Sequence, residues 1–66
     1  MMENENKIKK LRIKRKMTQV ELCKKVGITV PALSRIENNH TIPHDVTLKA
    51  IAQALGVSMD QLKGIK

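Results

Sequence analysis

The sequence contains no Phe, Tyr or Trp among its 66 residues. Proteins that bind single-stranded DNA or RNA usually stack bases on aromatic side chains, so this absence disfavours both ligands. Double-stranded DNA is read through its grooves and phosphates and needs no such rings. Among nucleic acids, the composition therefore favours the duplex.

Cysteine is scarce as well, since Cys23 is the only one and no intrachain disulfide can form. A structural zinc site needs about four ligands, and Cys23, His40 and His44 lack the paired spacing of a zinc finger. A lone cysteine is typical of a reducing compartment. We interpret Cys23 as a small buried apolar residue rather than a redox sensor, and we expect no metal and no cofactor.

Long apolar runs are missing, because no stretch approaches the roughly 20 residues of a membrane span. The first six residues, MMENEN, are acidic and polar, unlike a signal peptide. We therefore expect a cytoplasmic protein without a membrane partner.

The usual marks of catalysis are also absent. There is no glycine-rich phosphate loop, and His40 and His44 have no serine or cysteine nucleophile beside them in the sequence. A chain of this length has little room for a substrate-sized pocket. We expect neither an enzyme nor a small-molecule ligand.

The sequence does have a large positive charge, with a formal net charge of +7 and a pI of about 10.0. Such an excess suggests an anionic partner, with DNA as the first candidate. Seven of the ten residues in 7–16 are basic, and Ile8 and Leu11 share one helical face. We predict a helix from about residue 6 to residue 16 after a flexible arm, residues 1–6. Most of its lysines are interpreted as a solvated face, with a few near its end contacting phosphate.

The organising stretch is residues 18–39, which fit two short amphipathic helices and a tight turn. Thr18-x-x-Glu21 matches a capping box at the start of the first helix. Gly27 is suited to the left-handed conformation that ends it. Thr29 is then suited to cap the second helix. The pattern predicts a helix-turn-helix.

The second helix of this motif has Pro31 in its first turn, where a missing N–H costs little. The proline bars the Thr29 hydroxyl from the N–H two residues on, so we expect the cap bond to reach Ala32. Leu33 and Ile36 point inward. The outward residues are Val30, Pro31, Ser34 and Arg35.

The C-terminal half continues the helical pattern. Asn39 is suited to a left-handed helix end, and residues 40–45 read as a loop. Asp45 is predicted to cap a fourth helix that Gly56 closes. A second capping box opens a short fifth helix: Ser58-x-x-Gln61. We predict an all-α domain of five helices.

The outward face of the helix-turn-helix has groups suited to duplex DNA. Arg35 can donate two hydrogen bonds to guanine, and Ser34 can donate or accept one. Val30 and Pro31 can make apolar contacts, as with a thymine methyl group. Gln19 can bond a phosphate at the start of its helix.

The chain resembles the Cro and phage-repressor type of helix-turn-helix, the XRE-like regulators, over residues 7–62. The residues that carry the resemblance are Leu11-Arg12 with Met17-Thr18-Gln19; Glu21-Leu22 with Gly27, Leu33 and Ile36-Glu37-Asn38; and Pro43 with Leu48, Ala52 and Leu55-Gly56-Val57.

The resemblance implies a compact lambda-repressor-like domain, here residues 7–66, with a recognition helix at about residues 30–37. It implies a transcriptional regulator, with repression favoured over activation. The regulator is expected to bind a roughly palindromic duplex operator as a homodimer. It also implies an ion pair between Arg12 and Glu37. The candidate DNA-binding residues are Gln19, Thr29, Val30, Pro31, Ser34, Arg35, Asn38 and His40.

The sequence departs from the family pattern at three places. Cys23 stands where alanine is preferred, and Asn39 stands where glycine is usual. Val30 and Pro31 replace a polar pair that many phage repressors use to read bases. Base readout is therefore expected to rest mainly on Arg35, with Ser34.

A dimer needs a twofold contact, and the candidate surface is the fifth helix and its approach. The candidate interface residues are Met59, Leu62 and Ile65. Alternatively, Val57 and Leu62 close the core of the monomer. A competing function for the same fold is an antitoxin-like or adaptor module that binds another protein.

Overall fold

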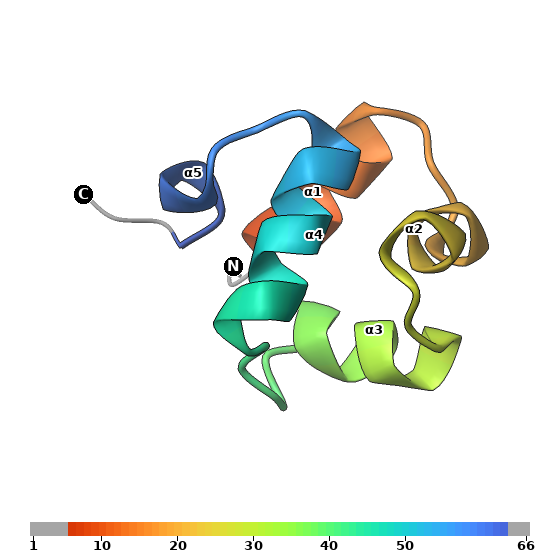
Figure 1. Ribbon diagram of the computed structural model, residues 1–66. Coiled ribbons are helices and arrows are strands. Elements are labelled where there is room, and N and C mark those ends of the chain that lie inside the picture. Colours follow the sequence, from red (N-terminus) through yellow and green to blue (C-terminus); the bar gives the residue numbers. More distant parts are fainter. Residues whose placement is uncertain (1–5, 64–66) are drawn as a thin grey trace, which may run out of the picture.

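Five α-helices follow one another along the chain in the computed structural model, which describes residues 6–63 (Figure 1). This part of the chain contains no strand, so the prediction of an all-α, five-helix fold is confirmed. The helices are α1 (Lys7–Lys14), α2 (Gln19–Val26), α3 (Val30–Glu37), α4 (Asp45–Leu55) and α5 (Met59–Lys63).

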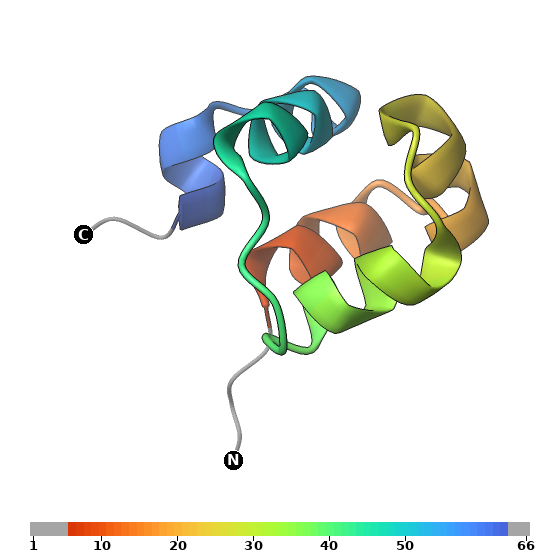
Figure 2. The ribbon, with the colours of Figure 1, turned by 60° about the horizontal axis from the view of Figure 1, so that its bottom comes forward.

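The core lies where α4 packs against α2 and α5, with α1 and α3 closing the remaining sides (Figures 1 and 2). Leu22, Leu33, Ile51 and Leu55 are almost completely buried. Burying one such side chain stabilises the fold by about 1.5–3 kcal/mol. The ten buried apolar residues are Ile8, Leu22, Cys23, Leu33, Ile36, Leu48, Ile51, Ala52, Leu55 and Leu62.

The first helix is shorter than predicted at both ends. Asn6 caps it, because its Oδ1 accepts hydrogen bonds from the N–H groups of Ile8 (2.7 Å) and Lys9 (3.3 Å). The Asn6 amide also donates to the Ile36 carbonyl and to Asn39 Oδ1, both at 2.9 Å. The prediction of an arm through residue 6 was therefore wrong at Asn6, and residues 1–5 lie outside the described residues.

α1 ends at Lys14 rather than at residue 16. Lys16 has a φ of +59°, a left-handed conformation that a helix cannot contain. This residue turns the chain toward α2, and the Met17 N–H donates back to the Arg12 carbonyl at 3.0 Å.

The predicted local caps of the helix-turn-helix are present. Thr18 Oγ1 accepts from the Glu21 N–H (3.1 Å), while Glu21 Oε1 accepts from the Thr18 N–H (2.8 Å). Gly27 ends α2 with a φ of +87°. Thr29 Oγ1 accepts from the Ala32 N–H at 3.2 Å, the bond that Pro31 dictates. These short-range hydrogen bonds thus define where α2 and α3 begin, and Gly27 defines where α2 ends.

The cap predicted for α4 was wrong. His44 is the N-cap residue and makes no side-chain cap bond, and Asp45 is the first helical residue. The Asp45 carboxylate still lies in the first turn, where negative charge stabilises the helix dipole. The later capping box between Ser58 and Gln61 is formed, with distances of 3.0 and 3.2 Å.

None of the helices between residues 6 and 63 has the length and apolar character that crossing a membrane requires.

Candidate nucleic-acid interface

An ion pair holds the C-terminal end of α3. Arg12 Nε donates to Glu37 Oε2 at 2.7 Å, and Arg12 Nη2 donates to Oε1 at 3.2 Å. A third guanidinium N–H bonds the Met17 carbonyl at 2.8 Å. Because the Glu37 side chain is only 2% exposed and that of Arg12 11%, this pair fixes α3 relative to α1 and to the turn that leads to α2.

Gln19 joins the same cluster from the start of α2. Its Nε2 donates to Glu37 Oε1 at 3.0 Å, and the residue is half-buried. The sequence predicted a phosphate contact for this amide and gave no sign of the bond to Glu37, which lies 18 residues away. Since an amide carries two N–H donors, Gln19 has a further donor besides the bond to Glu37.

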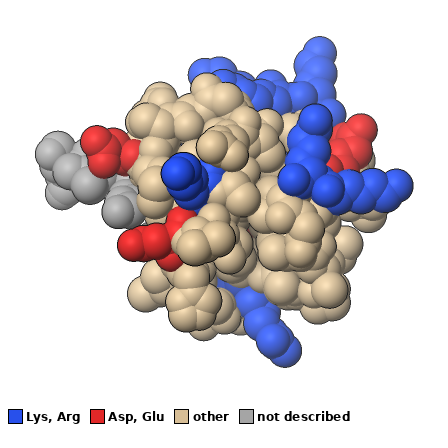
Figure 3. Space-filling model, in the orientation of Figure 1, with Lys and Arg blue, Asp and Glu red and all other residues tan. Residues whose placement is uncertain are grey.

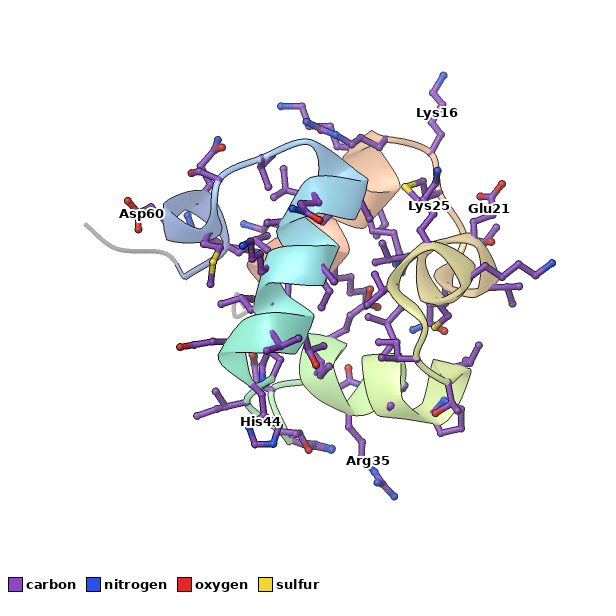
Figure 4. The ribbon with its side chains drawn as sticks, viewed as in Figure 1. Lys16, Glu21, Lys25, Arg35, His44 and Asp60 are labelled. Carbon is purple, nitrogen blue, oxygen red and sulfur yellow. The ribbon has the colours of Figure 1, made fainter. Side chains whose placement is uncertain are left out.

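The outward side of α3 forms the candidate interface. Arg35 is exposed and points away from the body of the molecule (Figure 4). Val30 is 36% exposed and Pro31 is exposed, as the sequence predicted. Thr29 is exposed beside them at the start of the helix. The arrangement therefore presents one cation, one hydroxyl and two apolar side chains along a single helix.

Ser34 and Asn38 are linked on this side of α3. The Asn38 amide donates to Ser34 Oγ at 3.4 Å, and Ser34 is half-buried. Because the hydroxyl accepts this bond, its own O–H remains free to donate to an acceptor on a base or phosphate. Asn38 is exposed and lies at the end of the helix, where it caps α3.

The chain beyond α3 lies along one edge of the interface. His40 is exposed, and its backbone N–H donates to the Arg35 carbonyl at 2.8 Å. His44, which the sequence did not single out as a contact, lies on the same side of the molecule as Arg35 (Figure 4).

Positive charge is concentrated away from α3. Lys and Arg side chains gather over the end of α1 and over α2, whereas the lower side carries little (Figure 3). In residues 26–62 the only Lys or Arg residues are Arg35 and Lys49. Lys16, near the end of the basic run, points to the side opposite Arg35 (Figure 4), contrary to a phosphate contact there. Arg35 is thus the one cation of α3.

Cys23 lies in the core at 4% exposure, beside this framework. Burial raises the pKa of its thiol, the Glu37 carboxylate raises it further, and the Arg12 guanidinium lowers it. A buried thiol with a raised pKa is a poor nucleophile at neutral pH. This environment matches the interpretation of Cys23 as a small buried residue. Among the described residues, no three His, Cys, Asp or Glu side chains come together to hold a metal ion.

The candidate dimer residues divide between the core and the surface. Leu62 is 7% exposed and packs in the core, which was the alternative interpretation from the sequence. Val57 and Met59 are half-buried against the same core. Ile65 lies outside the described residues. On α5, Met59 is thus the candidate with side-chain surface left for a partner.

Comparison with known proteins adds to this geometry. A model of the helix-turn-helix family matches residues 8–62. The chain is 38% identical over 58 residues to the immunity repressor protein of Bacillus phage phi105, covering 88% of this chain and 40% of that protein. It is 34% identical over 56 residues to the propionyl-CoA carboxylase regulator of Cereibacter sphaeroides, covering 85% of this chain and 12% of that protein. The chain thus spans less than half of either relative.

Proposed function

Because the chain belongs to the XRE-type helix-turn-helix family of DNA-binding transcriptional regulators, we propose that it is a repressor that places α3 in the major groove of a duplex operator. The observation that carries this proposal is the outward side of α3. Its exposed side chains face away from the core, with Arg35 extended from the middle of the helix. An α-helix fits the major groove, where each base pair presents a distinct pattern of donors and acceptors.

In this arrangement Arg35 selects guanine by donating two hydrogen bonds to its O6 and N7. The Ser34 O–H donates to a neighbouring acceptor. Val30 and Pro31 select thymine through contact with its methyl group. The operator half-site is therefore read by one charged, one polar and two apolar groups.

Contacts to phosphate set the register of α3 on the duplex. Gln19 and the free N–H groups at the start of α2 contact one strand. Thr29 lies at the start of α3, and Asn38 and His40 contact phosphates beyond its C-terminal end, the end to which Gln19 is bonded through Glu37. The ion pair between Arg12 and Glu37, with the bond from Gln19, holds the C-terminal end of α3 before DNA binds, so little ordering is needed there on binding.

We further propose that the repressor binds a roughly palindromic operator as a homodimer. One α3 helix covers a single half-site, and a twofold axis presents a second copy to the next half-site about 34 Å away. The phage relative is an immunity repressor by name, which supports repression as the outcome. A dimer bound at an operator represses by blocking access of the transcription machinery to the same DNA.

Selection from random duplex DNA at physiological salt tests the proposal directly. The expected product is an inverted repeat whose half-site centres are separated by about 10–10.5 base pairs or a multiple of that. Enrichment of a single half-site would contradict the dimer but retain the regulator. The proposal fails altogether if no sequence is enriched over the starting pool. In that case, recovery of a stoichiometric small protein partner favours the adaptor function instead.

A further inference from the structure

Among the side chains that the structure describes, the two most exposed large apolar ones lie four residues apart. Ile42, in the loop before α4, is 91% exposed, and Val46, in the first turn of α4, is 82% exposed. The next most exposed are Ile13 and Val20, both at 51% on α1 and α2. Scattered apolar residues are common on protein surfaces, but here two that are almost fully exposed lie within five residues of the chain. We call Ile42 and Val46 the apolar knob.

A groove of about 580 Å³ lies directly beside the apolar knob. Ile8, Ile36 and Leu48 contribute the apolar edges of the core to its floor, and Leu62 of α5 extends it. Ile42 itself forms part of the wall, together with Pro43. The apolar knob therefore adjoins, at Ile42, a recess with an apolar floor, and the rest of the lining is polar, from Asn6, Asn39, Thr41 and Asp45.

We propose that a second copy of this chain docks on this face, with the apolar knob of each copy entering the groove of the other. A twofold contact brings the same patch of both copies together, so each patch must complement itself. A projection beside a matching recess meets that condition. It would hide Ile42 and Val46 from water in both copies at once, which the monomer does not achieve.

Charge at the edge of the knob is also self-complementary. Asp45 lines the groove, and Lys49 lies one turn further along α4, where both are exposed. The only ion pair found between side chains in residues 6–62 joins Arg12 to Glu37, so neither charge is neutralised within the described chain. In the docked pair, Asp45 of each copy faces Lys49 of the other and fixes the direction in which the two helices cross.

The position of this surface fits the operator. His44, which lies between Ile42 and Val46 in sequence, is on the same side of the molecule as Arg35 (Figure 4). We expect a contact there to lie beside the outward side of α3 and to place both recognition helices on one side of the dimer, facing one duplex. The inference rests on the homodimer proposed above and moves its contact from α5 to the start of α4, with Leu62 as the shared edge.

Sedimentation equilibrium of the free protein tests the surface without DNA. The test variant is Ile42→Gln with Val46→Gln, and the matched control is Ile13→Gln with Val20→Gln, which removes exposed apolar side chains elsewhere. We expect a wild-type dimer, a test variant whose dimer dissociation constant rises about tenfold or more, and an unchanged control. Thermal unfolding followed by circular dichroism should show that all three proteins remain folded.

A charge exchange tests the pairing. Lys49→Asp alone should weaken the dimer by repulsion with Asp45, and adding Asp45→Lys should restore most of the loss. The proposal is overturned if the test variant dimerises like the wild type, or if the wild type stays monomeric at the highest concentration that remains in solution. Because these measurements use no DNA, they can fail while operator selection succeeds, and the reverse also holds.

Discussion

Arg12 and Glu37 are 25 residues apart, and two hydrogen bonds of 2.7 and 3.2 Å join them at the end of α3. The carboxylate also accepts from Gln19 at 3.0 Å, so one buried side chain connects the first three helices. A buried carboxylate is tolerated only when opposite charge and hydrogen bonds replace its lost water. α3 is therefore positioned by polar groups as well as by apolar packing.

Removing the Arg12 side chain should leave Glu37 charged and without its cation. We expect Arg12→Ala to lower the free energy of unfolding by about 3–5 kcal/mol, because the buried charge then lacks compensation. Urea denaturation at low temperature measures this loss. The double variant Arg12→Met with Glu37→Met removes both charges and should recover much of the stability. Equal losses in the single and double variants would contradict a role for the uncompensated carboxylate.

The turn between α2 and α3 offers a test of backbone conformation alone. Gly27 has a φ of +87°, and a Cβ built there meets nothing within 4 Å. Gly27→Ala should therefore lower the free energy of unfolding by about 1–2 kcal/mol through the left-handed conformation and not through a clash. Gly27→Asn should cost clearly less, since asparagine tolerates this conformation. Urea denaturation of both variants measures the two losses in the free energy of unfolding. Equal losses would contradict the left-handed conformation as their cause.

Most of what the sequence predicted correctly is local. The bonds between Thr18 and Glu21 and from Ala32 to Thr29 close within one helical turn, so residue type and spacing are enough to indicate them. The left-handed conformation at position 27 is predicted in the same way, because the residue there is a glycine. Nothing comparable marks Lys16, whose positive φ ends α1 without a glycine, and the helix was accordingly predicted too long.

Contacts between distant residues account for the rest. Asn6 bonds Ile36 and Asn39 across 30 and 33 residues, and no spacing rule predicts such pairs. The Arg12–Glu37 pair was expected only through family resemblance. The exposure of Ile42 depends on the path of the loop between α3 and α4, and the pattern of apolar residues does not predict that path. In the candidate site, the helical period is enough to predict which residues of α3 face outward. The hydrogen bonds of Glu37 with Arg12 and Gln19 join distant parts of the chain and become visible only in the folded structure.

The pH dependence of stability should reveal the buried thiol. Burial and the Glu37 carboxylate raise the pKa of Cys23, with Arg12 opposing them, whereas an unfolded cysteine titrates near pH 8.5. Below that pH both states keep the proton and the contribution to stability is complete. As the pH rises further, the unfolded chain loses its proton first, so the free energy of unfolding falls until the folded pKa is reached.

Cys23→Ala provides the reference for this effect, because alanine does not titrate. The stability of the wild type relative to Cys23→Ala, measured by urea denaturation, should decrease between about pH 8 and pH 10. Titration of the lysines affects both proteins alike and cancels in the difference. A difference that stays constant over this range would show that the folded and unfolded thiols titrate alike.

Arg35 should govern discrimination between operator and other DNA. As the one cation of α3, it is the group suited to bidentate bonding of guanine, which is worth about 1–3 kcal/mol. Arg35→Ala should therefore weaken operator binding about 5- to 150-fold and weaken binding to random duplex much less. Arg35→Lys keeps the charge but cannot bond in two places, so it should restore affinity for random duplex and not the discrimination. Lys16→Gln removes a cation on the side of the molecule opposite Arg35 and serves as the control. Fluorescence anisotropy at fixed salt measures all four proteins, and full discrimination in Arg35→Lys would exclude bidentate readout by Arg35.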